Sequence, residues 1–244
     1  IVFPKTLVKV APGAFANCKN LKEVEMNTGL LEIGDESFSF CPSLTGVKMP
    51  DTVKRIGEGA FEGCASLSSL KLSESIYMIG ASAFSFCFNL TEVTIPDSCV
   101  LVEFNAFANC FSLEGVKLSC NMGLLDESTF EGCRSLKYVD MPTKLVKISA
   151  RAFKGCSSLS QIILPVGMSS LGFDAFADCS FLYSVKIEEG LEIIAEGAFD
   201  NCRMLRDITL PSTLVSIGNN AFNGCSLLWA VVFPEGLQSI GDSA

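Results

Sequence analysis

Apolar residues return along this chain every 23 residues, without a single insertion or deletion. Phenylalanine, cysteine and leucine fill three of these positions, in that order and three residues apart, in ten successive copies. A fixed period between about 20 and 50 residues is typical of a stacked repeat array. The cysteines that mark the period are Cys18, Cys41, Cys64, Cys87, Cys110, Cys133, Cys156, Cys179, Cys202 and Cys225.

Each repeat predicts one short β-strand. The consensus unit reads L-x-x-V-x-(I/L/M)-P-x-x-(V/L)-x-x-I-G-x-x-A-F-x-x-C-x-x. Its Val-x-Ile part alternates apolar and polar residues, as in a strand that buries one face. In one copy, Val93 and Ile95 would point inward, and Glu92 and Thr94 outward. Pro96 has no amide hydrogen to donate and would end that strand.

The rest of the unit predicts turns. The Ile-Gly pair would bring the chain around a tight bend, in which glycine can adopt a positive φ. In Ala-Phe-x-x-Cys, the phenylalanine and cysteine are three residues apart, which is the spacing of neighbours on one face of a helical turn. The glycines of the bend are Gly34, Gly57, Gly80, Gly172, Gly218 and Gly241.

A single repeat cannot fold alone. Burial of its apolar side chains would stabilise it by on the order of 15 kcal/mol, at ~2 kcal/mol each. Ordering the backbone costs roughly 1–2 kcal/mol per residue, which is more in total. Neighbouring repeats must therefore share a core and pair their strands, as in a solenoid. We expect residues 1–244 to form one domain of about ten and a half repeats, and to be part of a longer array because no cap is visible at either end.

The repeat resembles that of the BspA-like, or Treponema pallidum-type, leucine-rich repeat family over essentially the whole chain. One copy shows the matching frame, Leu44-x-x-Val47-x-Met49-Pro50-x-x-Val53-x-x-Ile56-Gly57-x-x-Ala60-Phe61-x-x-Cys64. The commoner leucine-rich classes place Asn or Cys after the strand, where this chain has residues such as Thr52 and Ser75. The resemblance implies a right-handed superhelix with a parallel β-sheet on its concave side. It also implies a surface or secreted protein with a role in adhesion and protein binding.

Composition excludes several other functions. The chain has no histidine, so it cannot build a Ser-His-Asp site, a Cys-His site or a zinc site with histidine ligands. Its formal net charge of −9 lacks the basic footprint of a nucleic-acid binder. Its apolar runs are too short to span a bilayer. We expect no enzymatic activity, no cofactor, no metal, no nucleic-acid partner and no direct insertion into membranes.

The cysteine ladder has two interpretations. Disulfides between adjacent coils are geometrically allowed, but an unbroken ladder offers no natural pairing. We therefore favour ten small buried residues that behave as hydrophobic side chains. A straight ladder also cannot converge four ligands on one zinc ion. Two cysteines lie off the ladder: Cys99 aligns with a core position, whereas Cys120 aligns with a loop position and is the candidate free thiol.

The outward strand positions form the candidate binding face. They include Lys48, Lys71, Lys117, Tyr138, Asp140, Ile163 and Lys186. The four lysines make a broken basic stripe on an acidic protein, and Tyr138 and Ile163 are candidate interface anchors. A solvated sheet face that carries charge for solubility explains the same pattern equally well.

Other exposed positions stand out from the repeat. Six basic residues between Arg134 and Lys154 form a band around two coils. Phenylalanines beside the Phe-x-x-Cys segment, outside the repeat columns, either contact a partner or cover the edge of the core. They are Phe40, Phe86, Phe88 and Phe111. In the last full coil, Trp229 and Val232 are apolar at positions that are polar in other coils, and they are further candidate contact residues for self-association. The triplet Asn89-Leu90-Thr91 is a glycosylation sequon.

These observations favour a non-catalytic binding scaffold with a protein or glycan ligand on the concave face. We expect an extracellular or cell-surface location, and a cytoplasmic one stays open. The alternative is a structural protein that self-associates through its uncapped ends, or laterally, into a larger array or filament.

Overall fold

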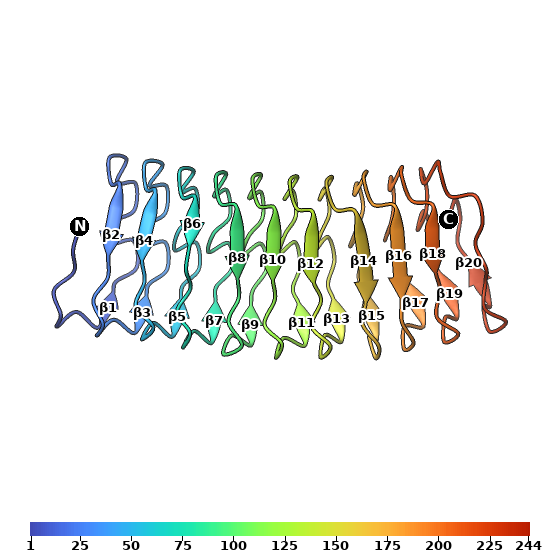
Figure 1. Cartoon of the computed structure of the whole chain (residues 1–244), viewed down its shortest axis with the longest axis horizontal. Coiled ribbons are helices and arrows are strands. Elements are labelled where there is room, and N and C mark those ends of the chain that lie inside the picture. Colours follow the sequence, from blue (N-terminus) through green and yellow to red (C-terminus); the bar gives the residue numbers. More distant parts are fainter.

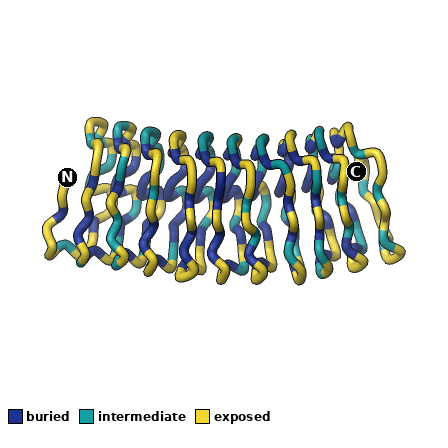
Figure 2. The backbone as a smooth tube through the Cα atoms, in the orientation of Figure 1, coloured by how far each residue is buried: buried dark blue, intermediate teal, exposed yellow.

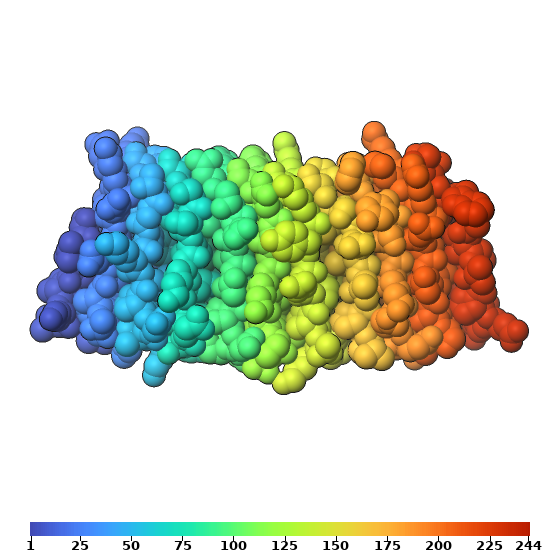
Figure 3. Space-filling model, in the orientation of Figure 1, coloured from blue at the N-terminus to red at the C-terminus, as the bar shows by residue number.

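The chain winds into a row of stacked coils and contains no helix. The computed structural model describes all residues from 1 to 244 and has twenty strands. Figure 1 shows the coils following one another in sequence order from the N-terminus to the C-terminus. In Figure 3 the colours pass along the molecule as successive bands, so each coil lies against the coils before and after it. The predicted repeat solenoid is therefore confirmed.

Each of the first nine repeats contributes one parallel strand of two to four residues (Figure 1), and we call these the longer strands because all but one exceed two residues. Val24 pairs with Val47 and Val93 with Val116, so the register advances by one repeat from coil to coil. The predicted alternation is confirmed, because Val93 is buried between two exposed neighbours. These strands are β2 (Glu23–Glu25), β4 (Gly46–Lys48), β6 (Ser69–Leu70), β8 (Glu92–Thr94), β10 (Gly115–Lys117), β12 (Tyr138–Asp140), β14 (Gln161–Leu164), β16 (Ser184–Ile187) and β18 (Asp207–Thr209).

A second ladder of two-residue parallel strands precedes the Gly column, where the sequence predicted only a bend. It places the Ile of the Ile-Gly pair in the core, for example Ile33 paired with Ile56. Its strands are β1 (Lys9–Val10), β3 (Glu32–Ile33), β5 (Arg55–Ile56), β7 (Met78–Ile79), β9 (Leu101–Val102), β11 (Leu124–Leu125), β13 (Lys147–Ile148), β15 (Ser170–Leu171), β17 (Ile193–Ile194), β19 (Ser216–Ile217) and β20 (Ser239–Ile240).

The ladder of longer strands is interrupted twice. Its paired groups are β2-β4-β6, β8-β10-β12 and β14-β16-β18. Strand β12 therefore pairs only with β10 on one side, and β14 only with β16 on the other. The backbone bond nearest to this second interruption runs from the Ser160 amide to the Lys137 carbonyl and is long, at 3.5 Å. This opening becomes important for the candidate site.

The Phe-x-x-Cys segment is not a helical turn, so that prediction is wrong. Two residues four apart adopt positive φ in each coil, such as Glu36 and Phe40, both at 52°. Between them, the Phe38 amide donates a 2.8 Å hydrogen bond to the carbonyl of Ala60 in the next coil. A helix would instead bond each amide to a carbonyl four residues earlier in the same segment. The segment is therefore a ribbon of turns that is bonded from coil to coil.

The glycine of each Ile-Gly pair is also needed for a different reason from the predicted one. None of these glycines has a positive φ. A Cβ at Gly172 would instead lie 2.5 Å from the backbone nitrogen of Ala150 in the preceding coil. The same conflict with the preceding backbone exists at Gly80, where the distance to the Glu58 nitrogen is 2.6 Å. Glycine therefore lets adjacent coils approach closely at this corner.

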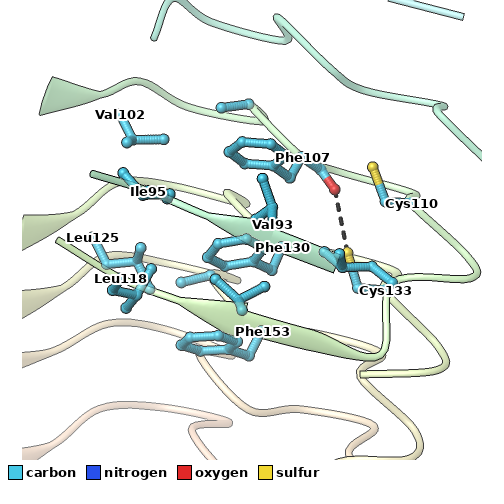
Figure 4. Close-up of a cluster of buried hydrophobic side chains, with 14 of the residues drawn as sticks. Val93, Ile95, Val102, Phe107, Cys110, Leu118, Leu125, Phe130, Cys133 and Phe153 are labelled. Carbon is cyan, nitrogen blue, oxygen red and sulfur yellow. Dashed lines mark hydrogen bonds between the residues drawn. The ribbon is translucent and has the colours of Figure 1, made fainter. Parts of the chain in front are cut away.

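The core is a continuous column that runs the length of the stack. Phenylalanines from Phe15 to Phe222 stack in parallel with centroids 5.1–5.6 Å apart. Figure 4 shows this column beside the buried cysteines, with the thiol of Cys133 donating a 3.2 Å hydrogen bond to the carbonyl of Phe107. Figure 2 shows that buried residues recur from coil to coil until the last one, which is exposed or half-buried throughout.

Candidate functional site

We call the outward side of the longer strands the strand face. The four lysines predicted to form a stripe, Lys48, Lys71, Lys117 and Lys186, are all exposed on it. Three of them meet acids: Lys48 lies 3.2 Å from Glu25, Lys71 lies 4.0 Å from Asp51, and Lys186 lies 2.6 Å from Glu188. Lys117 alone has no ion pair. The stripe is therefore largely neutralised on the protein itself and offers little net positive charge.

A groove of about 830 Å³ lies where β12 and β14 fail to pair, and we call it the central groove. Tyr138 and Asp140 border it from β12, and Ile163 borders it from β14. All three of these predicted residues are thus brought together around one hollow, with their side chains exposed. The remaining lining residues are Val139, Met141, Thr143, Gln161, Ile162, Pro165, Val166 and Glu188.

Tyr138 forms the border of the central groove on the side of β10. It pairs in register with Gly115 in the preceding coil, and its ring occupies the space where a side chain at that residue would stand. The ring therefore lies over β10 at the border of the groove. Val139 is only partly buried, whereas its equivalent Val116 is fully buried, which agrees with a local loosening of the stack. The sequence signal that marks this site is a large outward residue, Tyr138, one repeat after a glycine in the same column, Gly115.

The central groove combines apolar walls with unpaired negative charge. Ile163 and Val166 are exposed large aliphatic side chains, and Val166 was not identified from the sequence because it lies outside the strand columns. Asp140 has no ion pair, whereas Glu188 at the far border is held by Lys186. Such a surface suits an apolar side chain next to a cation.

The off-column phenylalanines separate into two places. Phe88 stacks on Phe111 at 4.9 Å, and Phe86 meets Phe88 edge to face at 6.1 Å. The guanidinium of Arg134 lies 4.7 Å above the Phe111 ring, and Phe111 is half-buried in consequence. Phe40 is remote from this cluster and lies over the next coil's Gly63, which leaves room for the ring because it has no side chain.

The cysteines occupy two environments. Cys99 is fully buried and Cys120 is exposed, while the ladder cysteines are buried apart from the half-buried Cys18. Each ladder thiol from Cys41 onward donates a hydrogen bond to the carbonyl of a phenylalanine in the preceding coil. Burial raises the pKa of the Cys64 thiol to about 12 and that of Cys99 to about 11. The ladder is thus a structural hydrogen-bonding column that carries little thiolate at neutral pH.

The remaining predicted positions are accessible. Asn89 is exposed directly beside Phe88 and the aromatic cluster. Trp229 and Val232 are almost fully exposed on the last coil, which forms no strand in the longer ladder. No group of histidine, cysteine or acidic side chains in the structure could hold a metal ion. The structure also has no helix of the length and apolarity that a membrane span requires.

Stacked coils with two parallel ladders, a phenylalanine column and a fixed 23-residue register define a leucine-rich repeat solenoid. The chain belongs to the BspA-type family. The family model described as "BspA type Leucine rich repeat region (6 copies)" matches residues 1–114 and 101–228. The sequence-based assignment to this family is thereby confirmed. No curated protein matches the chain.

Solved structures of bacterial repeat proteins have the same fold. A leucine-rich repeat protein from Bacteroides ovatus is 26% identical, with a TM-score of 0.68 over 99% of this chain and 82% of the other. The T. pallidum leucine-rich repeat protein is 28% identical, with a TM-score of 0.62 over 75% of this chain and 77% of the other. A leucine-rich cell surface protein from Faecalibacterium prausnitzii shares the fold at 24% identity. Its TM-score is 0.56 over 98% of this chain and 76% of the other.

Proposed function

We propose that this chain is a non-catalytic scaffold that binds another protein through the central groove of its strand face. The observation that carries the proposal is the interruption between β12 and β14, where Tyr138, Ile163 and Asp140 border a groove of about 830 Å³. Aromatic and aliphatic anchors around a desolvated pocket dominate the energy of protein interfaces. The partner therefore presents an apolar side chain to Ile163 and Val166, and a lysine or arginine to Asp140.

Membership of the family supports this function in general terms, because leucine-rich repeat proteins act as interaction scaffolds. The even distribution of ion pairs along the lysine stripe argues against a ligand recognised by charge alone on this face. A protein partner fits the apolar walls of the groove better than a glycan does. The lack of a histidine and of a metal-binding cluster supports the non-catalytic part of the proposal.

Selection of peptides against the folded protein tests this proposal. A library of random peptides displayed on phage is panned on the wild-type chain, and the enriched peptides are synthesised and titrated. We expect them to combine an aromatic or aliphatic residue with a nearby lysine or arginine. Replacement of Ile163 by Asp should weaken their binding by about tenfold or more, because it places a charge at the centre of the contact.

The chain offers a matched control for this variant. Ile193 in β17 is exposed to 55%, nearly as much as Ile163 at 58%, but it lies outside the strand face. Ile193→Asp should leave peptide binding unchanged. Equal affinities for the wild type and the Ile163→Asp variant would reject the central groove as the binding site.

A second candidate function is self-assembly, which the apolar surface of the last coil favours. Phe233 is exposed in the last coil, whereas its counterparts in earlier coils, such as Ile187 and Leu164, are buried. Trp229 and Val232 add exposed apolar surface in the same coil. A further coil of the same repeat, from the same polypeptide or from a second copy, would cover Phe233. For the full natural protein, self-assembly predicts a sedimentation coefficient that rises with concentration and returns to the monomer value in a Phe233→Asp variant. A strict monomer at every concentration would exclude this function.

An extracellular or cell-surface location forms part of the main proposal. Ladder thiols that are buried and hold their protons at neutral pH would resist oxidation there without forming disulfides. Labelling of intact producing cells with an impermeant amine reagent tests the location. We expect lysines such as Lys117 to be modified in intact cells. Modification only after lysis would place the protein inside.

A further inference from the structure

A second hollow lies close to the central groove, at the edge where the Phe-x-x-Cys turns lead into β12 and β14. Its volume is about 410 Å³, and we call it the serine hollow. Its lining residues are Lys137, Ser157, Ser158, Ser160 and Phe181. Neither the central groove nor the proposed function uses any of these residues.

The serine hollow exists because one coil lacks long side chains that its neighbours have. Ser157 stands one repeat after Arg134, and Ser160 stands one repeat after Lys137. On the other side, Ser158 is followed one repeat later by Phe181. Three short residues in one coil thus form a floor between a basic wall and an aromatic wall. A volume of this size falls within the range of small-ligand sites.

The floor of the serine hollow is lined by hydroxyl groups. The Ser157 hydroxyl donates a 3.2 Å hydrogen bond to the Arg134 carbonyl, and the Ser160 hydroxyl donates one of 3.4 Å to the Lys137 carbonyl. Since both protons are used within the protein, the lone pairs of both oxygens are free to accept hydrogen bonds. The Ser158 hydroxyl makes no hydrogen bond within the protein, so it can donate as well as accept. This arrangement suits a ligand that is itself rich in hydroxyl groups.

Basic side chains follow the edge on which the serine hollow lies, on an otherwise acidic protein. Lys137 lines it and also meets Glu114 at 2.7 Å. Arg134 precedes the floor by one coil and has no carboxylate partner, because its guanidinium lies over Phe111. Arg203 and Arg206 occupy the same two columns three repeats after Arg134 and Lys137, and neither forms an ion pair. The edge therefore has unpaired positive charge, unlike the lysine stripe of the strand face.

Phe181 supplies the aromatic wall. Its ring is half-exposed and makes no aromatic contact of its own, whereas Phe111 and Phe88 are engaged with each other. The negative face of an aromatic ring attracts the C–H groups of a saturated ring that lies flat on it. Together with the hydroxyl floor and the basic side chains, this ring suits a saturated ring that carries hydroxyl groups and a negative charge.

We propose that the serine hollow binds a sugar unit of an oligosaccharide that carries carboxylates. The C–H face of the sugar ring stacks on Phe181, its hydroxyl groups bond to Ser157, Ser158 and Ser160, and its carboxylate meets Lys137. Arginine and lysine are the natural partners of a carboxylate, arginine through paired hydrogen bonds. Arg134 on one side of the hollow, and Arg203 and Arg206 on the other, would engage acidic units further along the same oligosaccharide.

Calorimetric titration with defined oligomers tests the proposal. The probes are trigalacturonate, its neutral methyl ester, and a glutamate-rich peptide of the same charge. We expect trigalacturonate to bind, with an affinity that falls as salt is added, and the methyl ester to bind much more weakly. Phe181→Ala and Arg134→Ala should each weaken trigalacturonate binding by about tenfold. Ser158→Phe introduces the residue that stands one repeat later, at Phe181. This larger side chain should fill the hollow and abolish trigalacturonate binding.

A matched control accompanies these variants. Phe104 is exposed to 48%, close to Phe181 at 51%, but it lies beside Glu127 and Glu131, so Phe104→Ala should bind trigalacturonate like the wild type. Thermal melting establishes that each variant is folded, as expected for positions outside the buried core. No binding of trigalacturonate by the wild type, or binding unaffected by all three variants of the hollow, would overturn the proposal. So would equal binding of the glutamate-rich peptide with the same dependence on Phe181, which would indicate an acidic peptide site.

Discussion

The thiol of Cys133 is the single hydrogen-bond donor to the buried carbonyl of Phe107, 3.2 Å away in the preceding coil. One coil further on, the carbonyl of Phe130 has two donors. It accepts from the thiol of Cys156 and from the backbone amide of Cys133, each at 3.2 Å. The same side chain in the same column thus satisfies an otherwise unpaired carbonyl in one coil and adds a second bond in the next.

This difference predicts unequal effects of the same substitution. Cys133→Ala leaves the Phe107 carbonyl buried without a partner, which costs about 1–3 kcal/mol beyond the lost packing. Cys156→Ala removes the same volume but leaves the Phe130 carbonyl with its amide donor. Urea unfolding of the two variants should therefore show a lower midpoint for Cys133→Ala. Both cysteines are completely buried, so equal destabilisation would mean that only packing matters.

The role of the cysteine column could be predicted from the sequence only in part. Its period and its burial follow from spacing, since a column filled in every coil must face the shared core. The hydrogen bond to the preceding coil could not be foreseen, because it depends on turns with positive φ at residues such as Phe40 and Phe86. Bulky side chains rarely adopt that conformation, so composition gives no sign of it. The spacing of Phe and Cys instead suggested a helical turn that does not exist.

The glycine of the Ile-Gly pair gives a second prediction. Gly172→Ala would bring a methyl group to 2.5 Å from the backbone nitrogen of Ala150, so adjacent coils must separate locally. We expect a loss of about 1–3 kcal/mol in the free energy of unfolding, as for other overpacked sites. Gly46→Ala is the control, because a Cβ there meets no atom within 4 Å. Thermal melting should show a clear drop for Gly172→Ala and little change for Gly46→Ala. Similar melting temperatures would show that this corner is compliant.

The candidate binding sites could be predicted less fully than the fold. Outward strand positions follow from alternation, and Tyr138 and Ile163 were identified in this way. The central groove depends on β12 and β14 failing to pair, although both have the same consensus as their neighbours. The serine hollow depends on what is missing from one coil between Lys137 and Phe181. An unusual residue stands out in a repeat pattern, whereas the space left by small residues becomes visible only in the structure.

The ion pairs of Glu32 lead to a prediction for pH. Glu32 lies 3.0 Å from Lys9 and 2.8 Å from Arg55. The hydrogen bond from Lys9, assisted by Arg55 and opposed by partial burial, lowers the pKa of Glu32 below its ordinary value of 4.5. A carboxyl group with a lowered pKa stabilises the fold above the unfolded-state value and loses that contribution as pH falls through the folded-state value.

Replacing Glu32 with glutamine should therefore reduce stability at neutral pH by up to about 1 kcal/mol, given the partial exposure of the pair. The difference from the wild type should vanish in acid below the folded-state pKa. Urea unfolding across a series of pH values measures it. Glu25→Gln serves as the comparison, because the Glu25–Lys48 pair is more exposed and should contribute less. A Glu32→Gln effect that persists unchanged in acid would assign it to packing instead of charge.

Thiol labelling distinguishes Cys120 from the ladder. The Cys120 amide donates a 2.8 Å hydrogen bond to Asp97, and a hydrogen bond between the Cys120 thiol and the same carboxylate raises the pKa of that thiol. At neutral pH a disulfide reagent should modify Cys120 first, the half-buried Cys18 next, and the buried thiols only after unfolding, when all twelve become reactive.

Asp97→Asn removes the cause of the raised pKa, so more thiolate forms and Cys120 should react faster. Asp51→Asn, two repeats earlier in the same column, is the matched control and should leave the rate unchanged. Fast labelling of the ladder in the native protein would show that the coils open far more readily than their packing implies.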